Sequence, residues 1–186
     1  LYADKFNYEI QSQYSVQEIY AAAEKRKEYL HTEMYKLATQ LWQKYFGNTP
    51  MPQNQLSVIK MMIDTISVQH VARANFQTEI EKQLPELTKF VREKNLLYLD
   101  PTKPLKVRKE PEYMAGVAGA SMSSPGPYAK NGTAYYNVGS LAGWSDEKAE
   151  SYLREYNKYV LQVLNIHEAI PGHYVQLVYS NKAPSI

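Results

Sequence analysis

The distribution of glycine and proline most strongly limits how this chain can fold. The first 46 of its 186 residues contain neither residue type, whereas seven of the eight glycines lie after residue 110. Because glycine and proline are the residues that most often interrupt helices and form turns, a stretch without them favours long helices. The sequence therefore predicts a helical first part and a second part in which strands and loops are more frequent.

Residues 1–100 are predicted to form a long helical hairpin and a third helix. Ser15-Val16-Gln17-Glu18 has the pattern of a capping box, and apolar residues then recur at helical spacing as far as Gly47. The same periodicity from about residue 54 to residue 84 predicts an antiparallel partner for this helix. The third helix is expected to open at Pro85, because proline is tolerated in a first helical turn.

Residues 101–144 are predicted to form a small antiparallel β-sheet with loops. The segment Leu105 to Lys109 alternates between apolar and charged residues, and Ala134 to Val138 is rich in strand-forming residues. Asn131-Gly132 favours a tight turn, with residues 128–130 and 133–138 as hairpin arms.

Residues 145–186 are predicted to carry one further helix. Ser145 is expected to cap it, and apolar residues at helical spacing place His167 on its buried stripe. The helix should break at Pro171-Gly172, because proline cannot donate the backbone hydrogen bond that the helix requires.

Charge and composition exclude several classes of partner and site. Lys and Arg number 21 against 19 Asp and Glu, so no large single-sign field argues for nucleic acid as a partner. No apolar run approaches the ~20 residues of a transmembrane helix. Since cysteine is absent, any metal would be bound by His, Asp or Glu. The chain begins at Leu1, and we expect it to be part of a longer protein.

The segment from His167 to His173 carries the most informative chemistry. Zinc peptidases place two histidines four residues apart on a helix, with a glutamate directly after the first. Here His167-Glu168 is present, but the second histidine follows six positions after the first. On a regular helix this spacing would leave the imidazoles about 120° apart around the axis, too far apart to share a metal. A bulge at Pro171-Gly172 would return His173 to the place of an ordinary second ligand.

A lone histidine on an apolar stripe is usually a core residue with a satisfied hydrogen bond. However, a glutamate beside it, a Pro-Gly pair inside a helical pattern and a second histidine are all unfavourable for simple packing. Several local rules broken together favour a functional site.

His167-Glu168-Ala169-Ile170-Pro171-Gly172-His173, followed by Gln176, resembles the H-E-A-x-P-G-H-x-x-Q signature of the bacterial domain-of-unknown-function 885 family. Residues 111–114 and 134–138 also resemble segments of that family. The family is zincin-like and presumed to contain metallopeptidases. The resemblance implies a mostly helical protein with a zincin-like metal-binding helix. Together with the sheet predicted from the strand patterns, the expected fold class is mainly α with a small antiparallel sheet. All three segments would then be parts of one larger, helical, peptidase-like catalytic domain.

The resemblance also implies roles for individual residues. His167 and His173 would bind zinc, and Glu168 would activate a zinc-bound water for hydrolysis of short or unstructured peptides. The family's third, acidic ligand lies on a later helix, and no such motif occurs before Ile186. This fragment alone is therefore expected to be inactive.

Two weaker candidates for peptide binding accompany the motif. The small residues Gly116, Val117, Ala118 and Gly119 could form an edge strand that pairs with a substrate backbone, although tight packing is the commoner reason for such a run. Tyr135 and Tyr136 could line a cleft, but strand alternation should turn one of them into the core.

Two other functions stay open. The chain could be a catalytically inactive helical binding or scaffolding domain that has lost the metal, or its metal site could hydrolyse esters or other amides. Oligomeric state and location are not predicted. The bacterial cytoplasm and periplasm are both compatible with the sequence, as is an exported or lipid-anchored parent protein.

Overall fold

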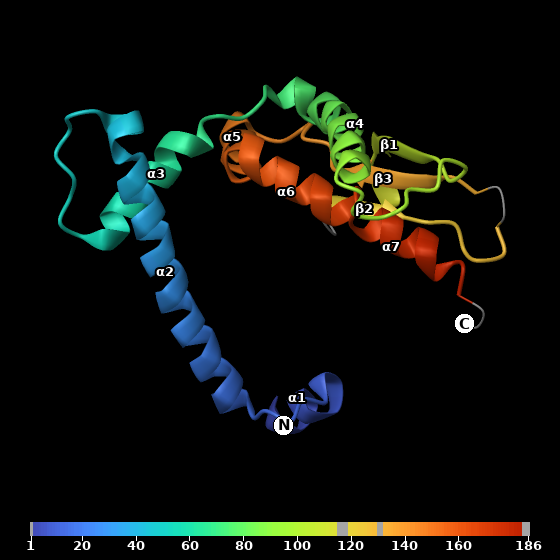
Figure 1. The fold of residues 1–186 in the computed structure, drawn as a ribbon, viewed down its shortest axis with the longest axis horizontal. Coiled ribbons are helices and arrows are strands. Elements are labelled where there is room, and N and C mark those ends of the chain that lie inside the picture. The colour runs from blue at the N-terminus through green and yellow to red at the C-terminus, as the bar shows by residue number, and fades with distance from the viewer. Residues whose placement is uncertain (1, 115–118, 130–131, 184–186) are drawn as a thin grey trace. The chain divides into compact units, whose positions relative to one another are not determined.

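The structure, a computed structural model, describes residues 2–114, 119–129 and 132–183 (Figure 1). The chain divides into two compact units, Leu1–Ile66 and Ser67–Ile186. The first unit is helical, whereas the second combines helices with a small sheet. No helix in the described part of the chain combines the length and the apolar character needed to cross a membrane.

The first unit contains α1 (Tyr2–Ile10), α2 (Val16–Phe46) and nearly all of α3 (Gln55–Ser67). The predicted capping box begins α2: the Ser15 hydroxyl accepts from the Glu18 N–H at 3.3 Å, and the Glu18 carboxylate accepts from the Ser15 N–H at 2.7 Å. These two bonds satisfy N–H groups that have no partner within the helix. The long first helix is thus confirmed.

Helix α3 packs against only the last part of α2. Their buried cluster contains Ala38 and Trp42 from α2 and Val58 and Met62 from α3. The predicted apolar stripe of α2 is accessible in this structure, with Leu30 and Leu37 at 43% and 55% exposure. The side chains that α3 buries, Ala38 and Trp42, therefore lie beside the predicted stripe and not on it. Helical spacing predicts the helix, but a face is buried only where a partner element lies against it.

The helix expected for residues 54–84 is two helices. Helix α3 ends at Ser67, and α4 (Phe76–Glu93) follows a short 3-10 turn, η1 (Arg73–Asn75). Pro85 therefore lies inside α4 rather than at the start of a separate helix. A proline in a helix interior costs about 3 kcal/mol. Burial of four large apolar side chains along α4 offsets that cost: Phe76, Ile80, Leu87 and Val91.

The predicted small sheet is present, but its pairing is mixed. Its strands are β1 (Leu105–Lys109), β2 (Ala120–Ser123) and β3 (Ala134–Val138), in the order β1-β3-β2. β2 pairs with β3 antiparallel, as expected, whereas β1 pairs with β3 in parallel. The long connection after β1 allows β3 to return beside it in the same direction.

The strand that pairs antiparallel with β3 is β2, and Tyr128 and Ala129 of the predicted arm belong to no strand. Lys130, the last residue of that arm, and Asn131 of the predicted turn lie outside the described residues. A short 3-10 turn, η2 (Glu112–Met114), lies between β1 and β2 in the sequence.

Helices α5 (Asp146–Glu155), α6 (Lys158–Glu168) and α7 (His173–Ser180) replace the single helix expected near the C-terminus. Ser145 caps α5 as predicted, accepting from the Lys148 N–H at 3.2 Å. Asn157 then starts a new helix, because its side-chain oxygen accepts from the N–H groups of Tyr159 and Val160. This unforeseen boundary changes which side of α6 is buried.

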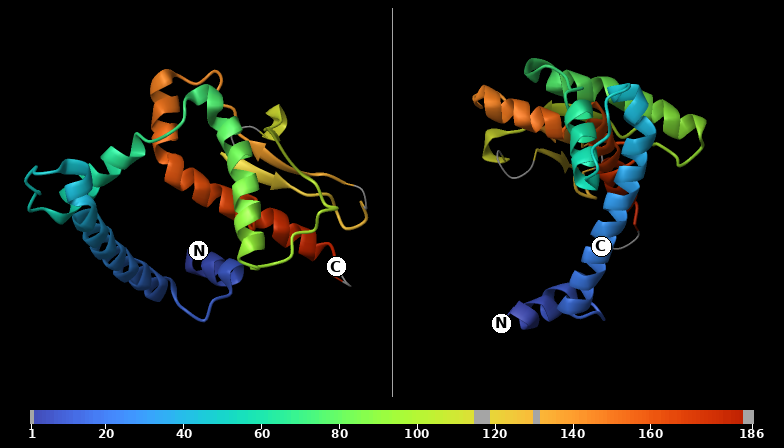
Figure 2. Two further views of the ribbon diagram at one scale, coloured as in Figure 1. Left: turned by 45° about the horizontal axis from the view of Figure 1, so that its top comes forward. Right: turned by 90° about the vertical axis from the view of Figure 1, so that its left-hand side faces the viewer.

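One core holds the second unit together. Helix α4 packs along β1 and α6 lies against β2, so both helices and α7 lie beside the sheet (Figure 2). The buried side chains of this core are Phe76, Ile80, Leu87, Val91, Ala120, Ala134, Tyr136, Val138, Leu141, Leu153, Leu161, Ala169, Ile170, Tyr174, Val175 and Val178. The predicted metal-binding residues thus lie at the junction of two helices that are anchored in the core.

Candidate metal centre

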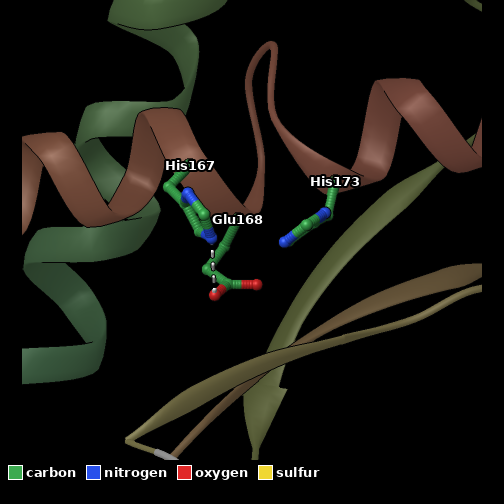
Figure 3. Close-up of side chains that lie close together, drawn as sticks. All are labelled: His167, Glu168 and His173. Atoms are coloured by element: carbon green, nitrogen blue, oxygen red, sulfur yellow. Dashed lines mark ion pairs between the residues drawn. The ribbon is translucent and has the colours of Figure 1, made fainter. Parts of the chain in front are cut away.

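Three side chains converge where α6 ends and α7 begins. His167 and Glu168 are the last two residues of α6, and His173 is the first residue of α7. One potential ligand atom from each lies within 4.8 Å of the others (Figure 3). The two imidazole rings are 4.7 Å apart between centroids, and the His167 Nε2 lies 3.9 Å from the Glu168 Oε1. The structure therefore brings together all three residues that the sequence predicted for the site.

A folded-back segment between the helices produces this convergence. The N–H groups of Ala169 and Ile170 both donate to the Asn165 carbonyl, at 3.0 and 3.1 Å, and the Gly172 N–H donates to the Ile166 carbonyl at 2.9 Å. The chain thus loops out over the last turn of α6 before α7 starts. The predicted break at Pro171-Gly172 is confirmed, and it places His173 beside His167.

Gly172 fits this segment because it has no side chain. A Cβ at this position would lie 1.7 Å from the His167 carbonyl oxygen, far inside van der Waals contact. The backbone of the loop can approach the end of α6 this closely only through a glycine.

Exposure differs within the trio. The His167 side chain is 64% exposed and that of Glu168 is 13% exposed, while His173 is also exposed. The expectation that His167 lies on the buried stripe is therefore wrong. The new helix start at Asn157 explains this, because α6 turns Leu161 and Asn165 inward instead. The imidazoles are accessible to a ligand from outside the core.

A buried chain of hydrogen bonds lies directly behind the site. The Tyr136 hydroxyl donates to Asn165 Oδ1 at 3.0 Å, and Asn165 Nδ2 donates to Gln83 Oε1 at 2.8 Å. Gln83 Nε2 in turn donates to Glu79 at 3.1 Å. Tyr136 and Asn165 are both fully buried. These hydrogen bonds link β3, α6 and α4, and they meet at Asn165, two residues before His167. The sequence alone does not reveal them, because their members are far apart in the sequence.

Burial raises the pKa of the Tyr136 hydroxyl, and the negative charge of Glu168 raises it further. The phenol therefore stays protonated and remains a hydrogen-bond donor. Tyr136 is the tyrosine that alternation turned into the core, and Tyr135 is the partly exposed one. The Arg108 guanidinium lies 4.0 Å from the centroid of the Tyr135 ring.

Only part of the predicted small-residue strip lies within the described residues. Gly116, Val117 and Ala118 lie outside the described residues. Gly119 is described, and a Cβ there would lie 2.3 Å from the Tyr152 hydroxyl, which supports tight packing at this position. The strand that follows, β2, is at one edge of the sheet and lies against α6.

The remaining histidines lie elsewhere. His70 Nδ1 is 3.0 Å from the Val71 carbonyl, and its Nε2 is 3.3 Å from Glu150. Within the described residues, only His167, Glu168 and His173 form a group of three or more side chains suited to hold a metal ion.

Fold and site together define a mainly helical protein with a small mixed sheet. Its candidate site consists of a His-Glu pair and a second histidine, which a looped-out segment brings together. The family profile described as bacterial protein of unknown function (DUF885) matches residues 1–186, and the chain belongs to this family. The family predicted from the motif is thereby confirmed. No curated protein matches the chain.

One solved structure is similar over nearly the whole chain. It is described as a candidate lipoprotein of unknown function from Shewanella oneidensis and shares 51% sequence identity, with a TM-score of 0.84. The match covers 99% of the present chain and 32% of that protein. The chain thus spans about a third of the length of this relative.

Proposed function

We propose that this chain supplies two zinc ligands and the general base of a zinc-dependent metallopeptidase. The observation that supports this most directly is the convergence of His167, Glu168 and His173 within 4.8 Å despite a spacing that a regular helix would not tolerate. The motif's resemblance to a zincin-like signature supports the same assignment.

The residues present fit a zinc ion. Zinc binds imidazole nitrogen at about 2.0–2.1 Å, so two such ligands are at most about 4 Å apart. Ligand atoms that lie within 4.8 Å of one another need only small side-chain rotations to reach that separation. Both imidazoles are exposed, and imidazole is a ligand type that suits zinc.

Zinc held by His167 and His173 would lower the pKa of a water in its open position to about 7 and polarise a substrate carbonyl. Glu168 would accept a proton from the attacking water and return it to the leaving amine. Its carboxylate lies below the His167 ring in Figure 3, on the side that faces the strands, and its side chain is less exposed than that of His167. This position supports the proposal that Glu168 transfers the proton.

Peptides are the proposed substrates. β2 is an edge strand beside α6, and an extended peptide can add to such an edge through backbone hydrogen bonds. This mode selects chains that are short or unstructured, because the backbone of a folded protein is already paired. Tyr135 is a further candidate contact.

A structural or catalytic zinc site needs at least three protein ligands, and this chain offers two histidines. We propose that an acidic residue elsewhere in the full-length protein supplies the third. The isolated segment 1–186 should then bind zinc weakly and show no turnover.

Metal analysis of the full-length protein tests this proposal. The protein would be purified without a metal-binding tag and compared with His173→Ala and with the control His70→Ala. About one zinc per chain is expected for the unmodified protein and the control, with loss of zinc in His173→Ala. Absence of metal in the unmodified protein, even after zinc is supplied, would overturn the proposal and favour a metal-free scaffolding role.

A peptide library and a panel of simple esters would then define the reaction. Zinc-dependent cleavage of peptides supports the proposed activity. Cleavage of esters alone would assign the same site to a different hydrolysis.

A further inference from the structure

Gln176 lies one helical turn after His173 in α7 and contacts its ring. The His173 Nδ1 is 3.0 Å from the Gln176 Oε1. We infer that Gln176 is a positioning residue that fixes the tautomer of His173 and so presents its Nε2 to zinc; this rests on the proposed function.

The direction of this hydrogen bond follows from its chemistry. The side-chain oxygen of glutamine can only accept, so the Nδ1 of His173 must carry the proton and donate it. In a neutral imidazole the other nitrogen, Nε2, then has the free lone pair that a metal requires. The contact therefore assigns one nitrogen of His173 as the metal ligand.

The backbone places Gln176 for this contact. Its N–H donates to the Gly172 carbonyl at 3.1 Å, in the first turn of α7. Side chains three residues apart on a helix lie on the same face, so Gln176 and His173 are neighbours as soon as α7 forms. The segment that brings His173 to the site thus also brings its hydrogen-bond partner.

The His167 imidazole makes no comparable contact with the neighbouring Glu168. The Glu168 Oε1 is 3.9 Å from the His167 Nε2, which is beyond hydrogen-bond distance. The contact with Gln176 is therefore the one that can orient a ring of this pair before metal binds. Removing a hydrogen-bond partner of a metal-bound histidine typically weakens metal affinity 10–100-fold.

The test compares Gln176→Ala, Gln176→Glu and the control Gln162→Ala, an exposed glutamine on α6, in the full-length protein. Zinc affinity would be measured by competition with a chelator. We expect Gln176→Ala to weaken zinc binding by about 10–100-fold. Gln176→Glu should keep the affinity of the unmodified protein, because a carboxylate also accepts the hydrogen bond. The control Gln162→Ala should match the unmodified protein. Affinity in Gln176→Ala within twofold of the unmodified protein would overturn the inference.

A second measurement separates this inference from the proposed function. Nitrogen NMR of metal-free protein labelled in histidine reports which ring nitrogen of His173 carries the proton. Protonation at Nδ1 that shifts to Nε2 in Gln176→Ala supports the assignment, and protonation at Nε2 in the unmodified protein overturns it. Failure of the proposed function would instead appear as absence of zinc binding by the unmodified protein.

Discussion

Gly172 controls the geometry of the candidate metal centre at the scale of a single residue. Its N–H donates to the Ile166 carbonyl, and a Cβ at this position would collide with the carbonyl of His167. The approach of these two backbones sets where α7 begins and hence where the His173 imidazole lies. A residue that carries no functional group thus determines whether the two functional groups meet.

Replacing Gly172 with alanine should open this segment. The added methyl group would lie 1.7 Å from a backbone oxygen, so the loop must move and His173 with it. We expect zinc affinity to fall more than 10-fold and unfolding free energy to fall by about 1–3 kcal/mol, as for other overpacked sites. Chelator competition and urea unfolding would measure the two effects.

Gly126→Ala is the matched control, because a Cβ at Gly126 meets nothing within 4 Å. Its zinc affinity and stability should stay close to those of the unmodified protein. Unchanged zinc affinity in Gly172→Ala would show that the folded-back segment does not position His173.

Glu168→Gln should separate metal binding from proton transfer. The amide keeps the size of the carboxylate but cannot accept the proton of the attacking water. Peptide turnover in the full-length protein is expected to fall by about 10²–10⁴-fold. Zinc content should stay near that of the unmodified protein, in contrast to His167→Ala, which should lose the metal. Retained turnover in Glu168→Gln would remove the general-base assignment.

Helix α6 is held by a buried polar chain as well as by apolar packing. Tyr136 from β3 and Gln83 from α4 hydrogen-bond to opposite ends of the Asn165 amide. Buried polar groups are costly unless they are paired, so this arrangement favours one orientation of α6 over others with the same apolar contacts. The helical turn that carries His167 and Glu168 comes directly after Asn165.

Tyr136→Phe tests this chain at the level of the element. The variant keeps the ring in the core but leaves Asn165 Oδ1 without its donor, at a cost of about 1–3 kcal/mol. Because the pKa of Tyr136 is raised, its phenol is protonated and the loss should be the same across the neutral pH range. Chemical denaturation would measure it.

Tyr135→Phe serves as the matched control, since its side chain lies on the opposite face of β3. Its effect should remain within about 0.5 kcal/mol. Equal losses in the two variants would show that the Asn165 hydrogen bond contributes no specific stability.

At the scale of the whole molecule, an ion pair joins distant parts of the second unit. Asp100, in the segment after α4, accepts from Lys182 just after α7 at 2.9 Å. Hydrogen bonds from Thr102 and Lys182 lower the pKa of Asp100 to about 2. The charged carboxylate thus ties the connection before the sheet to the end of the helix that carries His173.

This shift predicts how stability depends on acid. Because the folded pKa is below the unfolded value of about 3.9, the contribution of Asp100 is complete above about pH 4 and is lost as pH falls towards about 2. Asp100→Asn should therefore lower the melting temperature at neutral pH, and the difference from the unmodified protein should shrink over that acidic range. A difference that stayed constant from pH 7 to pH 2 would contradict the assignment.

Local sequence chemistry determined the features that depend on neighbouring residues. The caps at Ser15 and Ser145 and the break at Pro171-Gly172 each involve groups a few residues apart. The motif from His167 to His173 likewise identified the family and the candidate site. The approximate positions of β1 and β3 followed from alternation and strand propensity.

Tertiary structure decided what depends on distant partners. The continuation of α4 through Pro85, the parallel pairing of β1 with β3 and the pairing of Asn165 with Tyr136 each involve contacts between elements. His167 is exposed because α6 turns another side into the core that α4 and the sheet provide. Hydrogen bonds within a turn are specified by adjacent residues, whereas burial is a property of the surfaces that meet, and only the folded chain brings those surfaces together.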